Sequence, residues 1–205
     1  MSYSQNNEEA VLLDYFGGKA DGMLLEIGAF HPTRLSNTRA LLERGWSGML
    51  CDMSPFSLAN LVQAYAGNDR VRVVGGVITV EASGPASVWL VPPDEAKGRD
   101  GAVSTTEAWH KDKWAGQGHV PYVCGAISLP ELYAMLPSKV DLVSIDTEGT
   151  SMDLALAFDW ERFAVDAVVV EHDGSDAMVG RLVETHEVAA VNAENVVMVR
   201  GYGKR

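Results

Sequence analysis

The sequence predicts an α/β protein with a doubly wound, mostly parallel sheet. Short apolar runs rich in Val, Ile and Leu recur along the chain, as is typical of strands buried on both faces of a parallel sheet. The clearest runs cover residues 23–28, 48–52, 71–74, 140–146 and 166–171. Segments with helical character separate these runs, and such β–α alternation places helices on both faces of the sheet.

The intervening segments carry the start and stop signals of helices. The expected helices cover residues 6–16, 36–44, 55–66, 150–158 and 175–185. Pro55 suits the first turn of the helix at 55–66, Gly67 suits its end, and Gly45 suits the end of the helix at 36–44. Glu8 and Glu9 lie in the first turn of the opening helix, where the helix dipole favours acidic side chains.

The remaining segments complete the expected fold. Residues 187–191 and 196–200 are spaced like an antiparallel C-terminal hairpin, giving a seven-stranded, Rossmann-like sheet. Residues 81–130 are rich in Gly, Pro, Ser and Trp and show no helix–strand repeat, apart from one plausible strand at 87–91. We interpret this stretch as a lid or acceptor loop within a single domain that spans residues 1–205.

Composition excludes several classes of protein. With 47% hydrophobic and 21% charged residues, the chain has the balance of a globular domain, not of a disordered one. Its formal charge of −12 argues against a nucleic-acid partner. The two cysteines imply no disulfide framework, and the polar N-terminus and the lack of a long apolar stretch predict a cytoplasmic protein without membrane contact.

Acidic residues lie at or near the ends of four predicted strands. Glu26 precedes Gly28 by two residues, Asp52 closes the second strand, Asp146 the fourth and Glu171 the fifth. In an open α/β sheet, ligands bind outside the carboxyl ends of the strands. We therefore expect these carboxylates to surround a ligand site.

The glycine pattern limits the kind of ligand. The first strand is followed by a single glycine, so the G-x-G-x-x-G pattern of a dinucleotide site is missing, and neither a P-loop nor a G-x-S-x-G elbow occurs. A nicotinamide-dependent oxidoreductase is therefore disfavoured. A nucleoside-type ligand without a pyrophosphate remains, and Asp52 is placed to accept hydrogen bonds from its ribose hydroxyls.

The most specific motifs of the sequence are Ser-Asn-Thr at 36–38, Gly-Trp-Ser-Gly at 45–48 and Ser-Ile-Asp-Thr-Glu-Gly at 144–149. With these motifs the chain resembles the FkbM-type family of class I S-adenosylmethionine-dependent methyltransferases. Tyr-Ser-Gln at 3–5, Leu-Glu-Ile-Gly-Ala at 25–29 and Val-Val-Glu at 169–171 also match. Asp52 stands where the family usually has Glu, and the Met-Ser turn at 53–54 replaces an Asn-Pro type of turn.

The resemblance implies S-adenosylmethionine as cofactor. By analogy, Glu26 would serve its amino group and Asp52 its ribose, while Asn37 would orient its carboxylate or, equally, cap a helix. The full set of implied cofactor residues is Glu26, Gly28, Ala29, Asn37, Asp52, Met53, Gly76, Val77 and Asp146. Gly28 and Ala29 would let the backbone approach the methionine portion, and adenine would lie near Gly76 and Val77.

The implied reaction is transfer of a methyl group, most simply to an oxygen of a small polar acceptor such as a sugar or a biosynthetic intermediate. A hydroxyl acceptor benefits from a general base, and the candidates are Asp146, Glu148 and His172. Asp146, Glu171 and His172 could instead hold a divalent metal, an option that we do not favour. The alternative function is a non-catalytic, regulatory module that binds a nucleoside or S-adenosylmethionine.

Aromatic and basic residues cluster at positions 109–114 of the long stretch. Trp109 and Trp114 either form a lid whose rings stack on the acceptor or anchor the loop to the core, and the sequence leaves both open.

Overall fold

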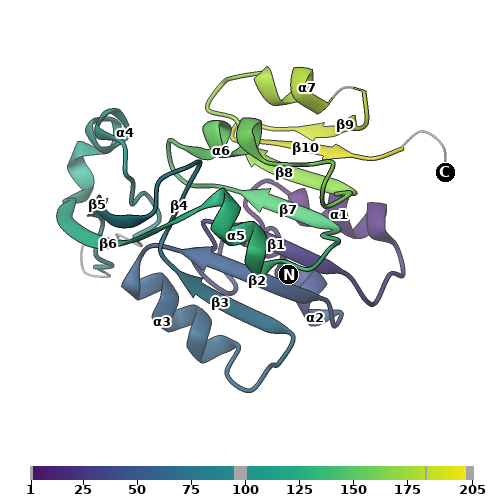
Figure 1. Cartoon of the computed structure of the whole chain (residues 1–205), viewed down its shortest axis with the longest axis horizontal. Helices are drawn as coiled ribbons and strands as arrows, with labels where there is room; N and C mark the ends of the chain where they lie inside the picture. Colours follow the sequence, from purple (N-terminus) through teal and green to yellow (C-terminus); the bar gives the residue numbers. More distant parts are fainter. Residues whose placement is uncertain (1, 95–100, 183, 202–205) are drawn as a thin grey trace.

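Seven strands form one sheet in the order β3-β2-β1-β7-β8-β10-β9 (Figure 1). The structure is a computed structural model that describes residues 2–94, 101–182 and 184–201. The strands of this sheet are β1 Met23–Ile27, β2 Ser47–Asp52, β3 Val71–Gly75, β7 Leu142–Ile145, β8 Ala167–Glu171, β9 Glu187–Val191 and β10 Asn195–Val199. Each coincides, within about two residues at either end, with a strand predicted from the sequence.

The sheet is doubly wound and mostly parallel, as predicted. β1, β2, β3, β7 and β8 pair in parallel, whereas β10 is antiparallel to both β8 and β9. The C-terminal hairpin is therefore present, and β9 again runs in the direction of the parallel strands. The strand order reverses between β1 and β7, because the chain first adds strands on one side of β1 and then on the other.

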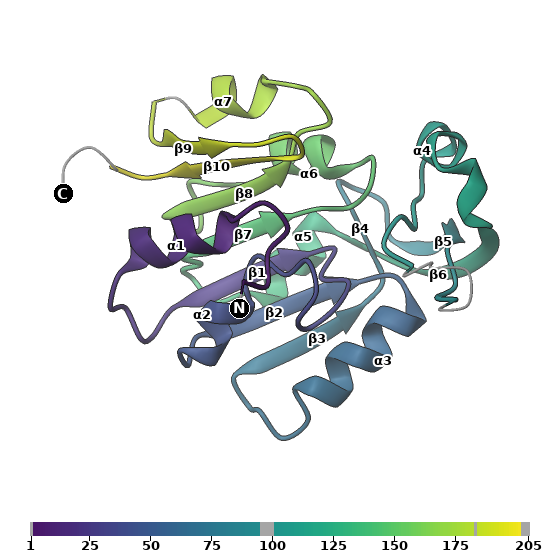
Figure 2. The same ribbon diagram turned by 180° about the vertical axis from the view of Figure 1, so that it is seen from behind.

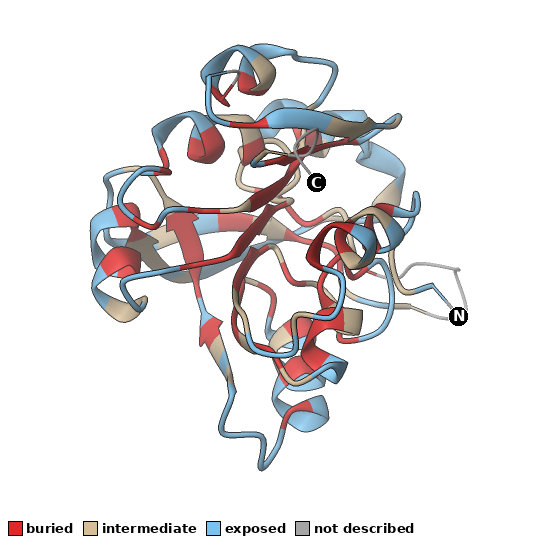
Figure 3. Ribbon diagram, turned by 90° about the vertical axis from the view of Figure 1, so that its right-hand side faces the viewer, coloured by how far each residue is buried: buried red, intermediate tan, exposed pale blue. Residues whose placement is uncertain are grey.

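Helices cover both faces of the sheet (Figure 2). The helices α1 Glu8–Phe16, α2 Arg39–Glu43 and α3 Pro55–Ala64 pack on one face around Trp46, Leu50 and Leu142. The helices α5 Leu129–Met135, α6 Ser151–Ala157 and α7 Ala177–Leu182 pack on the other face, around Val143 and Phe158. The inner strands β1, β2, β7, β8 and β10 are mostly buried (Figure 3), which explains their continuous apolar sequence, whereas the edge strands β3 and β9 are largely exposed or half-buried.

Local sequence signals fix the starts of two helices on the first face. Pro55 occupies the first turn of α3, and the Ser54 hydroxyl accepts a hydrogen bond from the Ser57 N–H, as expected for an N-cap. The segment predicted as a helix from residue 36 begins instead at Arg39. The Ser36 hydroxyl accepts from the Arg39 N–H, and Leu35 has a φ of +56°, so residues 35–38 form a turn ahead of the helix.

Residues 77–128 hold more regular structure than their composition predicts. β4 Val77–Thr79, β5 Gly84–Leu90 and β6 Val120–Ser128 form a three-stranded sheet in the order β4-β6-β5, and the short helix α4 Ala108–Lys113 precedes β6. Only part of β5 was expected, and residues 95–100 lie outside the described residues. This small sheet lies beside the main sheet (Figure 1).

None of the helices in the described part of the chain is long and apolar enough to cross a membrane.

Candidate functional site

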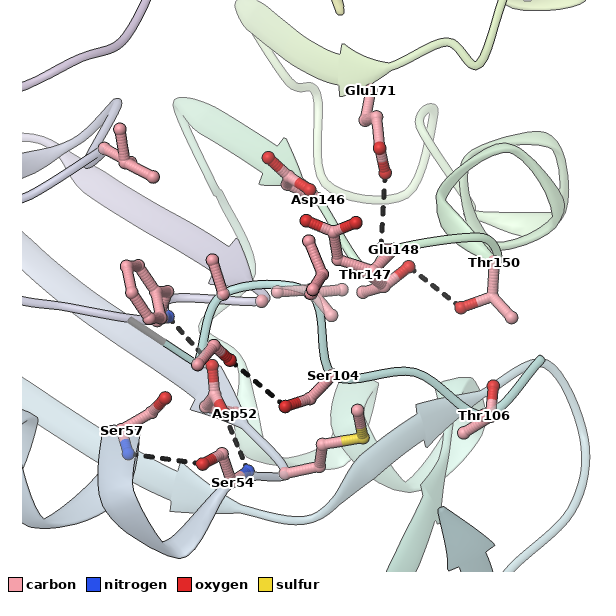
Figure 4. A pocket seen from close by; sticks show the side chains of 18 of the residues that line it. Asp52, Ser54, Ser57, Ser104, Thr106, Asp146, Thr147, Glu148, Thr150 and Glu171 are labelled. Atoms are coloured by element: carbon pink, nitrogen blue, oxygen red, sulfur yellow. Dashed lines mark hydrogen bonds between the residues drawn. The ribbon is translucent and has the colours of Figure 1, made fainter. Parts of the chain in front are cut away.

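A cavity of about 530 Å³ opens at the carboxyl ends of the parallel strands (Figure 4). Its walls include Gly28 after β1, Asp52 at the end of β2, Asp146 after β7 and Glu171 at the end of β8. Two of these strands, β1 and β7, flank the point where the strand order reverses. This is the position at which open α/β sheets bind their ligands, and the volume suits a small molecule.

Asp52 holds the turns on one side of the cavity. Its Oδ2 accepts a hydrogen bond from the Phe30 N–H at 2.8 Å, and its Oδ1 accepts from the Ser54 N–H at 2.7 Å. Burial raises the pKa of the Asp52 carboxyl, although the two N–H groups oppose the rise. Asp52 also lines the cavity, and its contact with a ribose stays a prediction.

The glycines of this wall are required by contacts within the protein. Gly28 has a φ of +85°, and a Cβ there would lie 1.6 Å from the carbonyl oxygen of Asp146. Gly76 has a φ of +148°, and a Cβ there would lie 2.8 Å from the carbonyl oxygen of Gly125. Both glycines line the cavity together with Met53 and Val77, which were also predicted to face a ligand.

Three predicted cofactor residues lie behind the cavity wall. Glu26 is buried, and its Oε2 accepts a hydrogen bond of 2.7 Å from the Thr38 hydroxyl. The amide of Asn37 donates to the Ser144 hydroxyl at 3.4 Å, so its side chain does not cap α2. Ala29 is part of the apolar core on the α1–α3 face.

Burial raises the pKa of Glu26 to about 7, and the nearby Asp52 adds to the rise, whereas the hydrogen bonds from Thr38 and the Asn37 backbone oppose it. A carboxyl with this pKa changes charge near neutral pH. Glu26 can therefore influence the cavity electrostatically without forming part of its surface.

Three carboxylates meet on the opposite side of the cavity. Ligand oxygens of Asp146, Glu148 and Glu171 all lie within 4.8 Å of one another, and Figure 4 shows the three side chains gathered at the ends of β7 and β8. The Ser151 hydroxyl donates to Glu171 Oε2 at 2.7 Å, and the Glu148 N–H donates to the same oxygen at 3.3 Å. We call these three residues the acidic cluster.

The acidic cluster is electrostatically strained. Burial, followed by the charges of Glu171 and Glu148, raises the pKa of Asp146 well above its usual range. Burial and the charge of Glu148 also raise the pKa of Glu171. The charges held together in the cluster therefore favour the protonated forms of Asp146 and Glu171.

His172 does not join this cluster. Its Nε2 lies 3.0 Å from the carbonyl oxygen of Asn192, and its Nδ1 accepts a hydrogen bond from the Gly174 N–H at 2.8 Å. With both ring nitrogens engaged by backbone groups, and with the ring absent from the cavity wall, the geometry gives no support to His172 as a base or a metal ligand. Glu148 takes the place that the sequence reasoning considered for His172 in a metal site.

The segment that precedes β6 covers the acidic cluster. The Thr105 hydroxyl donates to the Glu148 carbonyl oxygen at 2.6 Å, and His110 Nε2 lies 3.0 Å from Glu148 Oε2. Lys113 Nζ lies 3.7 Å from Asp173 Oδ1. These contacts attach α4 to the loops that follow β7 and β8.

The aromatic residues of α4 do not anchor it to the core. Trp109 is 50% exposed and Trp114 is 37% exposed, whereas His110 between them is completely buried. Trp114 lines the cavity, which agrees with the lid interpretation of this residue. His110, and not either tryptophan, is the residue of this segment that is buried against the rest of the protein.

Both ends of the chain contribute to the wall beside Glu171. Gln5 and Glu194 line the cavity, and the Gln5 amide donates to Glu194 Oε1 at 2.9 Å. The buried Glu8 accepts hydrogen bonds from the amides of Asn192 and Asn195, at 2.7 and 2.8 Å. The first turn of α1 is therefore fixed to the β9–β10 turn.

Sequence reasoning missed the contributions of His110, Thr105 and Glu194. No local pattern marks them, because each reaches the site through a tertiary contact with a distant segment. The sequence does mark the end of the irregular stretch. Ser128 and Glu131, with Pro130 between them, form a capping box at the start of α5.

No family model matches the chain, and no curated protein matches its sequence. Among solved structures, the chain is similar to the fibrillarin pre-rRNA processing protein of Methanococcus jannaschii, with 12% identity and a TM-score of 0.43 over 89% of this chain and 68% of that one. It is also similar to the C-terminal domain of precorrin-6Y C5,15-methyltransferase from Rhodobacter capsulatus, with 12% identity and a TM-score of 0.45 over 97% and 92% of the two chains. At this degree of similarity a functional assignment has to rest on the site.

Proposed function

We propose that this protein is an S-adenosylmethionine-dependent methyltransferase. The observation that carries the proposal is the cavity at the strand-order reversal, which has Asp52 on one side and the acidic cluster on the other. The sulfonium and the ammonium of S-adenosylmethionine are both cationic, and a cavity lined by carboxylates favours such a ligand. The resemblance of residues 36–38, 45–48 and 144–149 to FkbM-type enzymes supports the same function.

Residues of the cavity wall fit the parts of the cofactor. The carboxylate of Asp52, held in place by the N–H groups of Phe30 and Ser54, would accept hydrogen bonds from the ribose hydroxyls. Met53 and Val77 would provide the apolar surface for the adenine ring. The backbone at Gly28 lies on the same cavity wall and would face the amino acid portion. When bound, the cofactor supplies a methyl group on a good leaving group.

The acidic cluster would serve the acceptor. An acceptor hydroxyl whose oxygen forms a bond to the methyl carbon must lose its proton, and the carboxylate oxygens of Asp146, Glu148 and Glu171 are suitable proton acceptors on this wall. We place Asp146 first among them because it directly follows β7, next to Gly28. Trp114 and Thr106 from the segment before β6 would line the acceptor side and exclude water.

The proposed acceptor is a small polar molecule that presents a hydroxyl group, such as a sugar or a biosynthetic intermediate. The cavity wall near the acidic cluster includes Thr147, Thr150 and Lys113. These side chains offer hydrogen bonds to hydroxyl groups on several sides.

Cofactor binding tests the first part of the proposal. Calorimetry with S-adenosylmethionine, S-adenosylhomocysteine and NAD should give saturable binding of the first two at one site per chain and no binding of NAD. Asp52→Ala should weaken S-adenosylhomocysteine binding by roughly 10- to 100-fold, since it removes a charged hydrogen-bond acceptor. Asp153→Asn on α6, an exposed acid outside the cavity, is the matched control and should bind normally.

Methyl transfer tests the second part. Release of S-adenosylhomocysteine with a library of hydroxylated acceptors should identify turnover that Asp146→Asn abolishes while cofactor binding persists. Cofactor binding without turnover on any acceptor would favour the non-catalytic, regulatory alternative. Tight NAD binding in place of S-adenosylmethionine would overturn the proposal.

A further inference from the structure

We propose that Asp146, Glu148 and Glu171 form a binding site for a hard divalent cation, which would hold an acceptor through two neighbouring oxygens. The cation would lie on the acceptor side of the site, and only its role in holding the acceptor rests on the proposed function. The cation site itself is argued from the residues and is tested without the cofactor.

The donor set and its spacing suit such an ion. Three carboxylates each offer an oxygen, and these oxygens lie within 4.8 Å of one another. In a six-coordinate site, metal–oxygen bonds of about 2.1 Å place opposite ligands about 4.2 Å apart, and bonds of about 2.4 Å place them about 4.8 Å apart. Oxygens that lie within 4.8 Å of one another are in the range spanned by the ligands of one such ion, so the cluster can hold Ca²⁺, Mg²⁺ or Mn²⁺ after side-chain adjustment.

A buried histidine gives an independent indication. The His110 side chain is completely buried, and neither of its ring nitrogens has an aligned hydrogen-bond partner in the described part of the chain. Its Nε2 nevertheless points at the acidic cluster, 3.0 Å from Glu148 Oε2. A buried imidazole without hydrogen bonds is costly, and a cation or its bound water among the three carboxylates would supply the missing partner.

Local charge also favours a cation. Asp173 and Glu194 line the same side of the cavity as the acidic cluster, and Lys113 is the one basic side chain on the described cavity wall. A divalent cation would neutralise two of these charges.

An occupied site would restrict the class of acceptor. Three protein oxygens leave about three positions of a six-coordinate ion for water or substrate. Each carboxylate would give one oxygen to the ion, the acceptor's proton would pass to a remaining carboxylate oxygen, and the cation would offset the charge that develops on the acceptor oxygen. Acceptors with two adjacent oxygens, such as a vicinal diol or a hydroxy acid, would occupy two of the open positions.

Manganese is the probe for the test. The cofactor-free full chain is titrated with Mn²⁺, and free Mn²⁺ is measured by electron paramagnetic resonance. One ion should bind per chain, and Mg²⁺ or Ca²⁺ should displace it. Asp146→Asn and Glu171→Gln should each weaken Mn²⁺ binding by roughly tenfold or more, and His110→Gln by a smaller factor.

Asp153→Asn is the control, because it neutralises an exposed acid of α6 outside the cavity, and it should change Mn²⁺ binding less than threefold. Circular dichroism and melting curves show whether each variant is folded. Absence of saturable Mn²⁺ binding to the folded wild-type chain, or equal binding by the cluster variants and the control, would overturn the cation site. Either result leaves S-adenosylhomocysteine binding as a separate measurement, so the two proposals fail independently.

Discussion

The backbone of Gly28 lies so close to Asp146 that a Cβ on Gly28 would stand 1.6 Å from the Asp146 carbonyl oxygen. The two residues follow the neighbouring strands β1 and β7, which are paired in parallel, and the Asp146 N–H donates to the Ile27 carbonyl oxygen at 2.9 Å. The glycine thus allows the strand ends to approach each other at the centre of the site.

Gly28→Ala should therefore destabilise the protein strongly. The new methyl group collides with backbone atoms, and the φ of +85° is unfavourable for alanine, so we expect a loss of about 3 kcal/mol or more in the free energy of unfolding. Gly18→Ala is the control, because a Cβ at Gly18 meets no atom within 4 Å. Urea denaturation of the two variants makes the comparison. A loss for Gly28→Ala no larger than for Gly18→Ala would contradict the described packing.

The pKa of Glu26 predicts a pH dependence of stability. Its value rises from 4.5 in the unfolded chain to about 7 in the folded one, so the folded state binds more protons between these values. The contribution of Glu26 to the free energy of unfolding is therefore largest below pH 4.5 and is lost as the pH rises through about 7. The change is at most about 3 kcal/mol, from 1.4 kcal/mol per pKa unit.

Denaturation of the ligand-free chain between pH 5 and 8 checks this expectation. In Glu26→Gln the fall in the free energy of unfolding over that range should be smaller than in the wild type. Asp153→Asn, on the exposed side of α6, should retain the wild-type slope. Identical slopes for Glu26→Gln and the wild type would show that Glu26 does not titrate in this range.

Glu8 predicts a pH dependence of the opposite sign. Burial by itself would raise the pKa of Glu8, but the hydrogen bonds from backbone N–H groups and from the Asn192 and Asn195 amides lower it below its usual value. The stabilisation is therefore present above the unfolded pKa of about 4.5 and is lost as the pH falls through the folded value. Glu8→Gln places an amide against two amide donors and should cost about 1–3 kcal/mol at pH 7.

The measurement for Glu8 is urea denaturation at pH 7 and pH 4. The cost of Glu8→Gln should be larger at pH 7 than at pH 4, and Glu161→Gln at an exposed position should cost little at either pH. An equal cost at both values would mean that the Glu8 charge does not contribute.

Thr105 predicts how firmly the α4 segment is held over the site. Its buried hydroxyl donates to the Glu148 carbonyl oxygen and accepts from the Glu107 N–H. Thr105→Val removes both bonds with little change in volume, so amide hydrogen exchange over residues 105–117 should become faster by roughly 10-fold. Thr106→Val is the control, because the Thr106 hydroxyl donates to the side chain of the adjacent Glu107 and not to the loop after β7. Hydrogen exchange in this variant should match the wild type.

Much of the fold could be predicted from the sequence because its main sheet is parallel. Buried strands such as 142–145 and 167–171 are continuous apolar runs, and helix signals such as Pro55 separate them. The small sheet could not be predicted in the same way. Its central strand β6 is mostly exposed and contains Pro121, so it shows neither an apolar run nor regular alternation.

The candidate site was predicted in outline for a similar reason. Asp52, Asp146 and Glu171 follow strands whose parallel arrangement brings their ends to one edge of the sheet, and all three line the cavity. The surroundings depend on contacts between distant segments. His110 and Glu148 lie 38 positions apart, and only the tertiary structure places them side by side.

The attachment of α1 to the β9–β10 turn has a consequence for the order of synthesis. Gln5 and Glu8 leave the ribosome early, but their partners Glu194, Asn192 and Asn195 are among the last residues of this sequence to be made. β10 must also insert between β8 and β9 before the sheet is complete. β1–β3 and their helices can therefore form while the ligand cavity still lacks one wall, and ligand binding can stabilise the chain only after β10 has joined the sheet.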